Sequence, residues 1–261
     1  MSRERRDEPV PIAGVRAIEA LLRHAPRRLI EVHHVEDSSG GARARLLESL
    51  ATCGVPLRPV TAHKLDLLAD GLRHQGLVAL ARPAEYVPWE TLLTDARALL
   101  LAVDQVTDPR NLGAMLRSAE AMGATGALLT TNRCARLGPV VARTSAGASE
   151  LLDVALETNL ARALRQAQAG GVQVLGADLD GVPPMAVDFN RPTVLVIGAE
   201  GSGLRRLTRE TCDALVTIPL VGATESLNAA VAASVLLYEA ARQRAAPHGT
   251  APALEKSDKE G

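Results

Sequence analysis

An apolar strand, a helix and a second apolar strand follow one another between residues 98 and 131. The strands are the runs ALLLAVD (98–104) and GALLTT (126–131), and the segment DPRNLGAMLRSAEAMGA (108–124) between them has the apolar spacing of a helix. Strands without polar alternation are typical of parallel sheets that helices cover on both faces. A helical crossover between two such strands joins parallel neighbours. This unit therefore predicts an α/β domain built on a parallel sheet.

The alternation extends in both directions and predicts two units. Before residue 82 the pattern predicts a small α/β unit, and residues 98–246 predict five or six parallel strands with a long last helix. Segment 83–97 contains two prolines and breaks the pattern, so it is interpreted as a linker. The polar stretch 247–261 predicts a disordered tail.

The expected elements follow from apolar periodicity and turn signals. In the N-terminal unit (residues 1–82) they are helices at 14–24, 42–54 and after 61, and strands at 28–35, 57–60 and 76–81. In the C-terminal unit (residues 98–246), after the strand–helix–strand run, they are helices near 140–148, after 158 and at 204–212, and strands at 172–177, 193–198 and 214–218.

The composition narrows the possible classes of protein. The 261 residues are 47% hydrophobic and 23% charged with a net charge of -1, which is typical of a globular protein in solution. No apolar run approaches the roughly 20 residues of a membrane span, and the start MSRERRDEPVP lacks a signal-peptide core, so a cytoplasmic location away from membranes is expected. Cys53, Cys134 and Cys212 form no closely spaced pair, and no histidines have metal-ligand spacing, so no metal site is predicted.

The cations are almost all arginine, since lysine occurs only at Lys64, Lys256 and Lys259. The planar guanidinium fork suits phosphate, although a genome with GC-rich codons would also favour arginine. Aromatic residues make up only 2% of the chain, which excludes a base-stacking platform. Nucleic acid would therefore be bound through arginine, backbone amides and shape. We expect one electropositive face that contains Arg110, Arg117 and some of Arg133, Arg136 and Arg143.

A glycine-rich turn, TVLVIGAEGSGL (193–204), follows a predicted strand. It suggests a dinucleotide site, but it follows a late strand of the sheet and lacks the acidic residue about 20 positions on that would hold a ribose. The glycines at 198, 201 and 203 are more consistent with a close backbone approach to another ligand, or with a simple turn.

Two further segments combine polar residues with a helix start. In the 108–124 helix, Asn111 is placed to cap, and Arg117 shares a face with small residues; either it serves a ligand or it forms a structural ion pair. In IPLVGATESLNAAVAASVLLYE (218–239), Ser226 or Asn228 would cap the last helix. A functional interpretation of either segment requires partners elsewhere in the chain.

Taken together, NLGAMLR, IGAEGSGL and IPLVGATESLNAAVAAS resemble, in order and spacing, the three signature motifs of the SpoU (TrmH-like) class of RNA ribose 2′-O-methyltransferases. The resemblance covers about residues 10–244, because the N-terminal unit, with its ending RHQGLVAL (73–80), is similar to the substrate-binding domain of bacterial 23S rRNA guanosine 2′-O-methyltransferases.

This resemblance implies a parallel-sheet catalytic domain whose C-terminal chain forms a deep trefoil knot (SPOUT class) and binds S-adenosylmethionine, with an N-terminal RNA-binding domain. It also implies a homodimer with active sites at the interface, and the 222–228 loop as part of the knot. By the family pattern, the catalytic residues are Asn111, Arg117, Glu200, Ser226 and Asn228, and the cofactor-binding residues are Gly198, Gly201, Ile218, Leu227 and Asn228.

The implied reaction moves a methyl group from the sulfonium to a ribose 2′-hydroxyl, most closely that of a guanosine in the peptidyl transferase region of 23S rRNA. A guanidinium is a poor base at neutral pH, so Arg117 is expected to stabilise the developing alkoxide and Glu200 to receive the proton. Two alternatives remain: the same reaction on tRNA or another rRNA nucleotide, and an RNA-binding assembly factor without catalysis.

Overall fold

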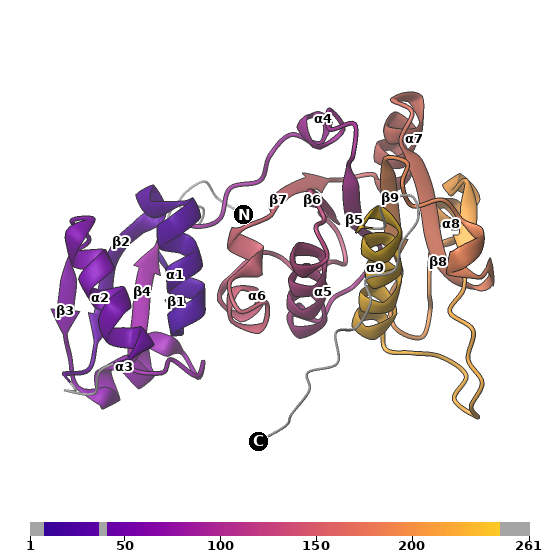
Figure 1. Ribbon diagram of the computed structural model, residues 1–261. Helices are drawn as coiled ribbons and strands as arrows, with labels where there is room; N and C mark the ends of the chain where they lie inside the picture. Colours follow the sequence, from indigo (N-terminus) through magenta and orange to yellow (C-terminus); the bar gives the residue numbers. More distant parts are fainter. Residues whose placement is uncertain (1–7, 37–40, 246–261) are drawn as a thin grey trace, which may run out of the picture.

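Two β-sheets of different size organise the chain, which a computed structural model describes for residues 8–36 and 41–245 (Figure 1). The N-terminal sheet has four strands in the order β1-β4-β2-β3, and the C-terminal sheet has six in the order β10-β8-β9-β5-β6-β7. Every pairing in the six-stranded sheet is parallel, which confirms the predicted α/β class. None of the helices in the described ranges is both long and apolar enough to cross a membrane.

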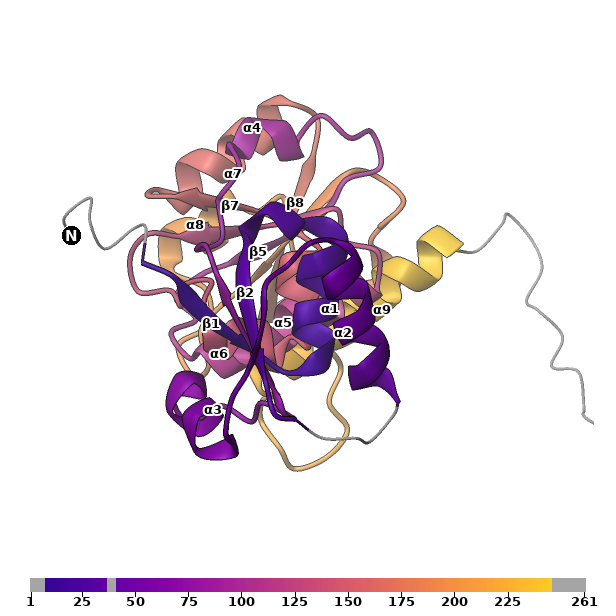
Figure 2. The same cartoon turned by 90° about the vertical axis from the view of Figure 1, so that its left-hand side faces the viewer.

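The N-terminal unit alternates strands and helices as its apolar pattern predicts. Its elements are β1 (Val10–Ala13), α1 (Val15–His24), η2 (Pro26–Arg28), β2 (Leu29–His34), α2 (Ala42–Thr52), β3 (Leu57–Pro59), α3 (Ala62–Ala69) and β4 (Leu77–Ala81). Viewed from the N-terminal side, α1 and α2 lie on one face of the small sheet and α3 on the other (Figure 2).

The C-terminal unit is preceded by a short helix, α4 (Trp89–Leu92), within segment 83–97. It then runs β5 (Leu99–Val103), α5 (Pro109–Ala121), β6 (Gly126–Thr130), α6 (Pro139–Thr144), η3 (Ala148–Glu150), β7 (Asp153–Glu157), α7 (Leu160–Ala169), β8 (Gln173–Val182), η4 (Pro184–Ala186), β9 (Thr193–Ile197), α8 (Arg206–Thr211), β10 (Ala214–Val216) and α9 (Ala229–Ala245). The predicted tail, 247–261, lies outside the described residues.

Strand β5 shows why a continuous apolar run belongs in this sheet. Leu99, Leu101 and Val103 pack on one face with α5 and α9, whereas Leu100 and Ala102 pack on the other face with α4 and α7. All five residues are fully buried. A strand in this position has no polar side, because helices cover the sheet on both faces (Figure 1).

Two strands that the sequence pattern did not predict lie at sheet edges. β1 pairs only with β4, in an antiparallel register, and contains Pro11, which an edge strand tolerates because it needs no donor on its free side. β6 is the only strand that pairs with β7 among the described elements, apart from a single bridge between Ala155 and Val87, and β7 has an acidic residue at each end, Asp153 and Glu157. Short strands with one neighbouring strand carry a weak apolar signal, so the pattern does not predict them.

The strand order places a crevice at one end of the large sheet. From β5 the chain runs through β6 to β7 on one side, and the later strands β8, β9 and β10 lie on the other side. The strand order therefore reverses between the parallel neighbours β5 and β9. Ligands of open α/β sheets bind outside the carboxyl ends of the strands at such a point, so this edge is where a functional site is expected.

Candidate active site

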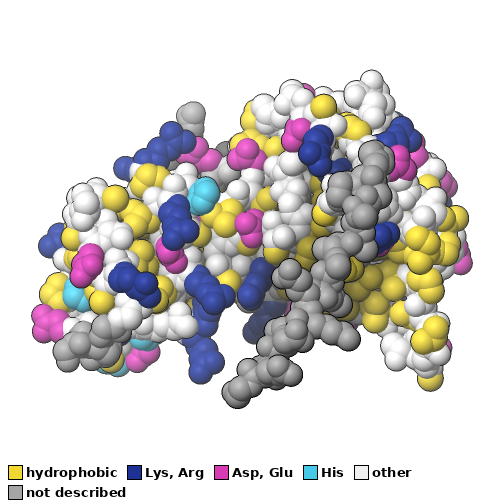
Figure 3. Space-filling view, viewed as in Figure 1, with side chains coloured by type: hydrophobic (Ala, Val, Ile, Leu, Met, Phe, Trp, Pro, Cys, Tyr) yellow, Lys and Arg dark blue, Asp and Glu magenta, His cyan; other side chains and the backbone are white. Residues whose placement is uncertain are grey.

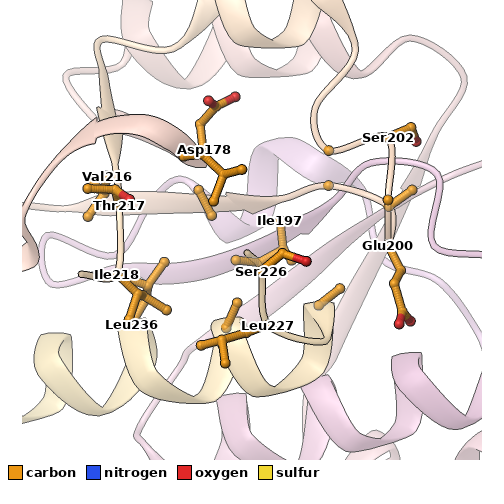
Figure 4. Close-up of a pocket in the computed structure, with 18 of the residues that line it drawn as sticks. Asp178, Ile197, Glu200, Ser202, Val216, Thr217, Ile218, Ser226, Leu227 and Leu236 are labelled. Atoms are coloured by element: carbon orange, nitrogen blue, oxygen red, sulfur yellow. The ribbon is translucent and has the colours of Figure 1, made fainter. Parts of the chain in front are cut away.

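A pocket of about 500 Å³ opens at the carboxyl ends of β8, β9 and β10 (Figure 4). Its walls are residues 177–180, 197–203, 216–218, 220 and 225–227, together with part of α9. Four of the five predicted cofactor residues line it, namely Gly198, Gly201, Ile218 and Leu227, whereas Asn228 is not among the lining residues. The predicted catalytic residues Glu200 and Ser226 also line it. Segments 197–203 and 217–228, which are far apart in sequence, thus enclose one cavity.

The glycines of the 198–203 turn are required by backbone packing. A Cβ atom on Gly198 would lie 2.2 Å from the carbonyl carbon of Gly203, so no other side chain fits there. Ala199 and Gly203 exchange backbone hydrogen bonds of 3.1 and 2.9 Å, and Gly201 and Gly203 have φ values of +83° and +63°. The turn closes on itself through these hydrogen bonds before α8 (Arg206–Thr211) begins, unlike the glycine-rich turn of a dinucleotide fold, which itself opens the helix.

Asp104 anchors this turn to the sheet, and sequence reasoning did not identify it. Its fully buried carboxylate accepts hydrogen bonds from the backbone N–H of Arg205 at 3.0 Å and from the Nε of Arg205 at 2.7 Å. Its own N–H donates to the carbonyl of Ile197. Asp104 therefore ties the end of β5 to both ends of the glycine turn. The only signal was an acidic residue directly after the apolar run ALLLAV.

Asn111, Glu200 and Asn228 come together beside the pocket. The Nδ2 of Asn228 lies 3.1 Å from Oε2 of Glu200 and 3.3 Å from Oδ1 of Asn111, and the Nδ2 of Asn111 lies 3.3 Å from the same Glu200 oxygen. Each residue comes from a different predicted motif. Both amides donate to one oxygen of Glu200, which leaves the second carboxylate oxygen open to a ligand.

The cap of α5 corrects one expectation. Asp108, not Asn111, is the N-cap, because its side chain accepts from the N–H of Arg110 at 2.8 Å. Asn111 is thereby free to contact Glu200. Asn228 serves two roles, since its Oδ1 accepts from the N–H of Ala230 at 2.9 Å while its Nδ2 contacts Glu200. The capping and functional interpretations of Asn228 are therefore compatible.

Arg117 lies apart from this cluster. It is exposed on α5, about a third of a turn around the helix from Asn111. Within the described ranges no carboxylate pairs with Arg117, so the structure shows no ion pair for it there. Ser226 likewise makes no hydrogen bond to any described residue, although its side chain lies at the pocket (Figure 4).

One wall of the pocket is held by charges that the sequence did not identify. Between Gly176 and Val182 the pairing of β8 with β10 changes register, so residues 177–181 leave the ladder. Arg209 of α8 holds this stretch through Asp178 and Asp180, each at 3.0 Å. These carboxylates raise the pKa of Arg209, with the hydrogen bond to Asp178 as the largest cause. The pair of acids in the sequence ADLD was the available signal.

The cysteines do not belong to this site. Burial raises the pKa of the Cys212 thiol to about 12 and also raises the pKa of Cys134, whereas Cys53 is exposed in the N-terminal unit. A thiol with such a raised pKa is a poor nucleophile at neutral pH. Across the two described ranges, no three His, Cys, Asp or Glu side chains are grouped so as to hold a metal ion.

Sequence profiles of two families match consecutive parts of the chain. The SpoU rRNA Methylase family matches residues 98–238, which include all three motifs. A second profile, described as RNA 2′-O ribose methyltransferase substrate binding, matches residues 11–87.

Known proteins resemble the chain over nearly its whole length. The 23S rRNA (guanosine-2′-O-)-methyltransferase RlmB of Bordetella pertussis is 44% identical over 238 residues, which cover 89% of this chain and 97% of that protein. An uncharacterized tRNA/rRNA methyltransferase of Mycolicibacterium vanbaalenii is 47% identical over 77% of this chain and 67% of that protein. The crystal structure of the SpoU methyltransferase AviRb from Streptomyces viridochromogenes in complex with AdoMet superimposes with a TM-score of 0.77 at 28% identity, covering 91% of each chain. The chain belongs to the SpoU rRNA methylase family.

Proposed function

We propose that this protein transfers a methyl group from S-adenosylmethionine to the ribose 2′-hydroxyl of a guanosine in 23S rRNA. The Asn111–Glu200–Asn228 cluster beside the pocket carries this proposal, because it places a carboxylate and two amides next to a cofactor-sized cavity. The similarity to the Bordetella enzyme over nearly the full chain supports the choice of RNA.

The pocket has the character that S-adenosylmethionine requires. Apolar side chains such as Ile197, Ile218 and Leu236 line it for the adenine and the methionine chain, and the backbone groups of two turns are available for polar atoms. Gly198, Gly201, Ile218, Leu227 and Asn228 are the residues that would hold the cofactor. When bound, the cofactor supplies the methyl group on a positively charged sulfur.

In the proposed reaction the ribose 2′-oxygen forms a bond to the methyl carbon as the bond from that carbon to sulfur breaks. Glu200 would take the hydroxyl proton on its open oxygen, directly or through water, as the cofactor sulfur leaves as a neutral thioether. Asn111 and Asn228 hold the Glu200 carboxylate, and Ser226 donates to the ribose. Arg117 stabilises the developing alkoxide and fixes the adjacent phosphate, since a guanidinium does not act as a base at neutral pH.

We infer a homodimer in which Arg117 lies at the pocket of the partner subunit, because Arg117 lies apart from the Asn111–Glu200–Asn228 cluster of its own chain. On α9 an apolar stripe is exposed: Val231 at 49%, Val235 at 38% and Tyr238 at 57%, spaced on one helix face. Exposed apolar groups spaced in this way mark interaction surfaces. Helix α5, which carries Arg117, packs beside α9. Pairing of two copies through this surface would place Arg117 at the partner's pocket. We also infer a deep trefoil knot in the C-terminal chain, with the 222–228 loop as part of it.

The arrangement of arginines supports RNA as the substrate. In the described ranges, Arg110, Arg117, Arg133, Arg136 and Arg143 pair with no carboxylate, whereas eight other arginines do: Arg23, Arg28, Arg58, Arg162, Arg205, Arg206, Arg209 and Arg242. Unpaired guanidinium groups are available to phosphates. Dark-blue side chains also border the hollow between the two units (Figure 3). We therefore assign RNA recognition to residues 1–82 together with these arginines, and methyl transfer to residues 98–246. We also infer a cytoplasmic location, where the ribosomal RNA is found.

The test is methyl transfer from labelled S-adenosylmethionine to unmodified 23S rRNA and to tRNA transcripts. Label in one 23S guanosine is the expected result. Label in tRNA would favour the tRNA alternative, and cofactor binding without transfer to naked RNA would indicate an assembling ribosomal particle as the substrate. Absence of cofactor binding would contradict the proposal.

A further inference from the structure

Helix α6 and turn η3 (residues 139–150) lie between the two units. Figure 1 shows α6 between α1 and α5, and the packing of the same segment against both helices agrees with that view. The N-terminal unit is therefore docked on a specific element of the C-terminal unit, in addition to its connection through segment 83–97.

On the side of the N-terminal unit the contact is close. Gly147 has φ +90°, and a Cβ there would lie 2.9 Å from Cβ of Ala20 and 3.0 Å from Cα of Ala17. Ala142 of α6 is buried within the same apolar cluster as Ile18 and Leu21 of α1. Small residues on both sides thus let α1 lie directly on the 139–150 segment.

A buried ion pair locks this contact. Arg28 of η2 pairs with Glu150 of η3, and their side chains are only 12% and 4% exposed. The Nε of Arg28 also donates to the carbonyl of Arg82 at 3.0 Å, where the chain leaves the N-terminal unit. A buried pair adds little to net stability but strongly disfavours any arrangement that separates the two charges. The pair therefore selects one orientation of the N-terminal unit.

On the opposite side the same segment supports the catalytic helix. A Cβ on Gly113 of α5 would lie 1.9 Å from Oγ1 of Thr144, so α5 and α6 touch at a glycine. Gly113 lies two residues after Asn111 and four before Arg117. Helix α5, which carries Asn111 and Arg117, therefore packs on the 139–150 segment. The N-terminal unit packs on the same segment.

We infer that the Arg28–Glu150 pair positions RNA for methyl transfer, by fixing the N-terminal unit on the segment that supports Asn111 and Arg117. This inference rests on the proposed function. RNA held by the N-terminal unit is presented to the pocket in one orientation, and without the pair it binds in many orientations of which few are productive. Arg28 and Glu150 are positioning residues, since neither lies at the pocket.

The experiment compares three full-length variants with the wild-type protein. Glu150→Gln keeps the shape and removes the charge; Arg28→Met with Glu150→Met removes both charges and leaves neither unpaired. Glu157→Gln is the matched control, because Glu157 pairs with Arg162 entirely within the C-terminal unit. For each protein, cofactor affinity is measured by calorimetry, and kcat and KM are measured with a 23S rRNA fragment below the thermal transition.

In both position-150 variants, kcat is expected to fall by about tenfold or more, because small misplacements of reactants are costly. In these two variants, KM for RNA and cofactor affinity should remain within about twofold of the wild-type values. In Glu157→Gln, kcat, KM and cofactor affinity should all remain within about twofold. Wild-type kcat in the double variant would overturn the inference, and so would a parallel loss of cofactor affinity. If Glu150→Gln does not fold, the kcat of the double variant tests the inference. Failure of the wild-type protein to methylate RNA would instead contradict the proposed function.

Discussion

The side-chain amide of Asn228 donates a hydrogen bond to the carboxylate of Glu200 over 3.1 Å and at the same time caps helix α9 through its oxygen. The start of the last helix and the glycine turn after β9 are therefore tied at one residue. Because Asn111 contacts the same carboxylate oxygen, Glu200 is held from two sides. A carboxylate oriented in this way is suited to receive a proton from a ribose hydroxyl.

Replacement of Glu200 by Gln is expected to lower kcat by about 100-fold or more, the usual contribution of a positioned proton acceptor. The amide keeps the size of the side chain, so cofactor affinity should stay near the wild-type value. Glu210→Gln is the control, because Glu210 pairs with Arg206 on the exposed face of α8. Single-turnover methyl transfer measures both variants, and wild-type turnover in Glu200→Gln would assign the proton to another group.

Replacement of Arg117 tests whether its charge or its fork is needed. Arg117→Ala is expected to lower kcat by about 100-fold or more, as for loss of an electrostatic stabiliser. Arg117→Lys keeps the charge and should retain measurable turnover; loss in both variants would assign the role to the fork geometry. Arg165→Ala, an exposed position of α7, serves as control. An Arg117→Ala enzyme as fast as the wild type would contradict a catalytic role.

Two glycines of the site should differ sharply in how well they tolerate substitution by alanine. Gly198→Ala forces a Cβ to within 2.2 Å of backbone, so the turn must move; we expect a loss of stability of about 2 kcal/mol or more and loss of cofactor binding. Gly222→Ala in the 217–228 loop should be tolerated, because its Cβ would meet no atom within 4 Å. Thermal unfolding with and without S-adenosylmethionine measures both effects. If Gly198→Ala were as stable and bound S-adenosylmethionine as well as Gly222→Ala, the turn at Gly198 would not be rigid.

The apolar stripe on α9 should control association. Val231→Glu combined with Tyr238→Glu is expected to convert a dimer to a monomer in light scattering and to lose turnover, because charged side chains oppose burial of this surface. Leu67→Glu adds a charge at a 64% exposed position of α3 and should leave the mass unchanged. A wild-type protein that is already monomeric, yet active, would contradict a shared active site.

Thiol reactivity should follow burial. Because the pKa of Cys212 is raised to about 12, its thiolate is scarce at every pH below that value, and the raised pKa of Cys134 acts in the same direction. Cys53 is exposed. A disulfide exchange reagent at pH 8 should therefore modify one thiol per chain rapidly and the other two only on unfolding. Rapid modification of all three would show that the sheet opens readily.

The sequence predicted the elements whose apolar pattern is strong and missed those defined by distant partners. β5 and α5 were evident because both faces of β5 are buried and α5 has a regular apolar stripe. β1 and β7 were missed because each is a short edge strand with one neighbouring strand. Asn111, Glu200 and Asn228 were expected together only through the family resemblance. The roles of Asp104 and of Arg28 with Glu150 depend on partners 101 and 122 residues away, which no local pattern indicates.

The most direct test of the central claim is the chemical position of the transferred methyl group. A 2′-O-methyl group removes the hydroxyl that attacks the neighbouring phosphodiester in alkali, so RNA labelled by this protein should release its label in an alkali-resistant dinucleotide. We predict such a dinucleotide, from 23S rRNA, with the methyl group on the ribose of a guanosine. Label recovered in ordinary mononucleotides would place the methyl group on a base and contradict the account.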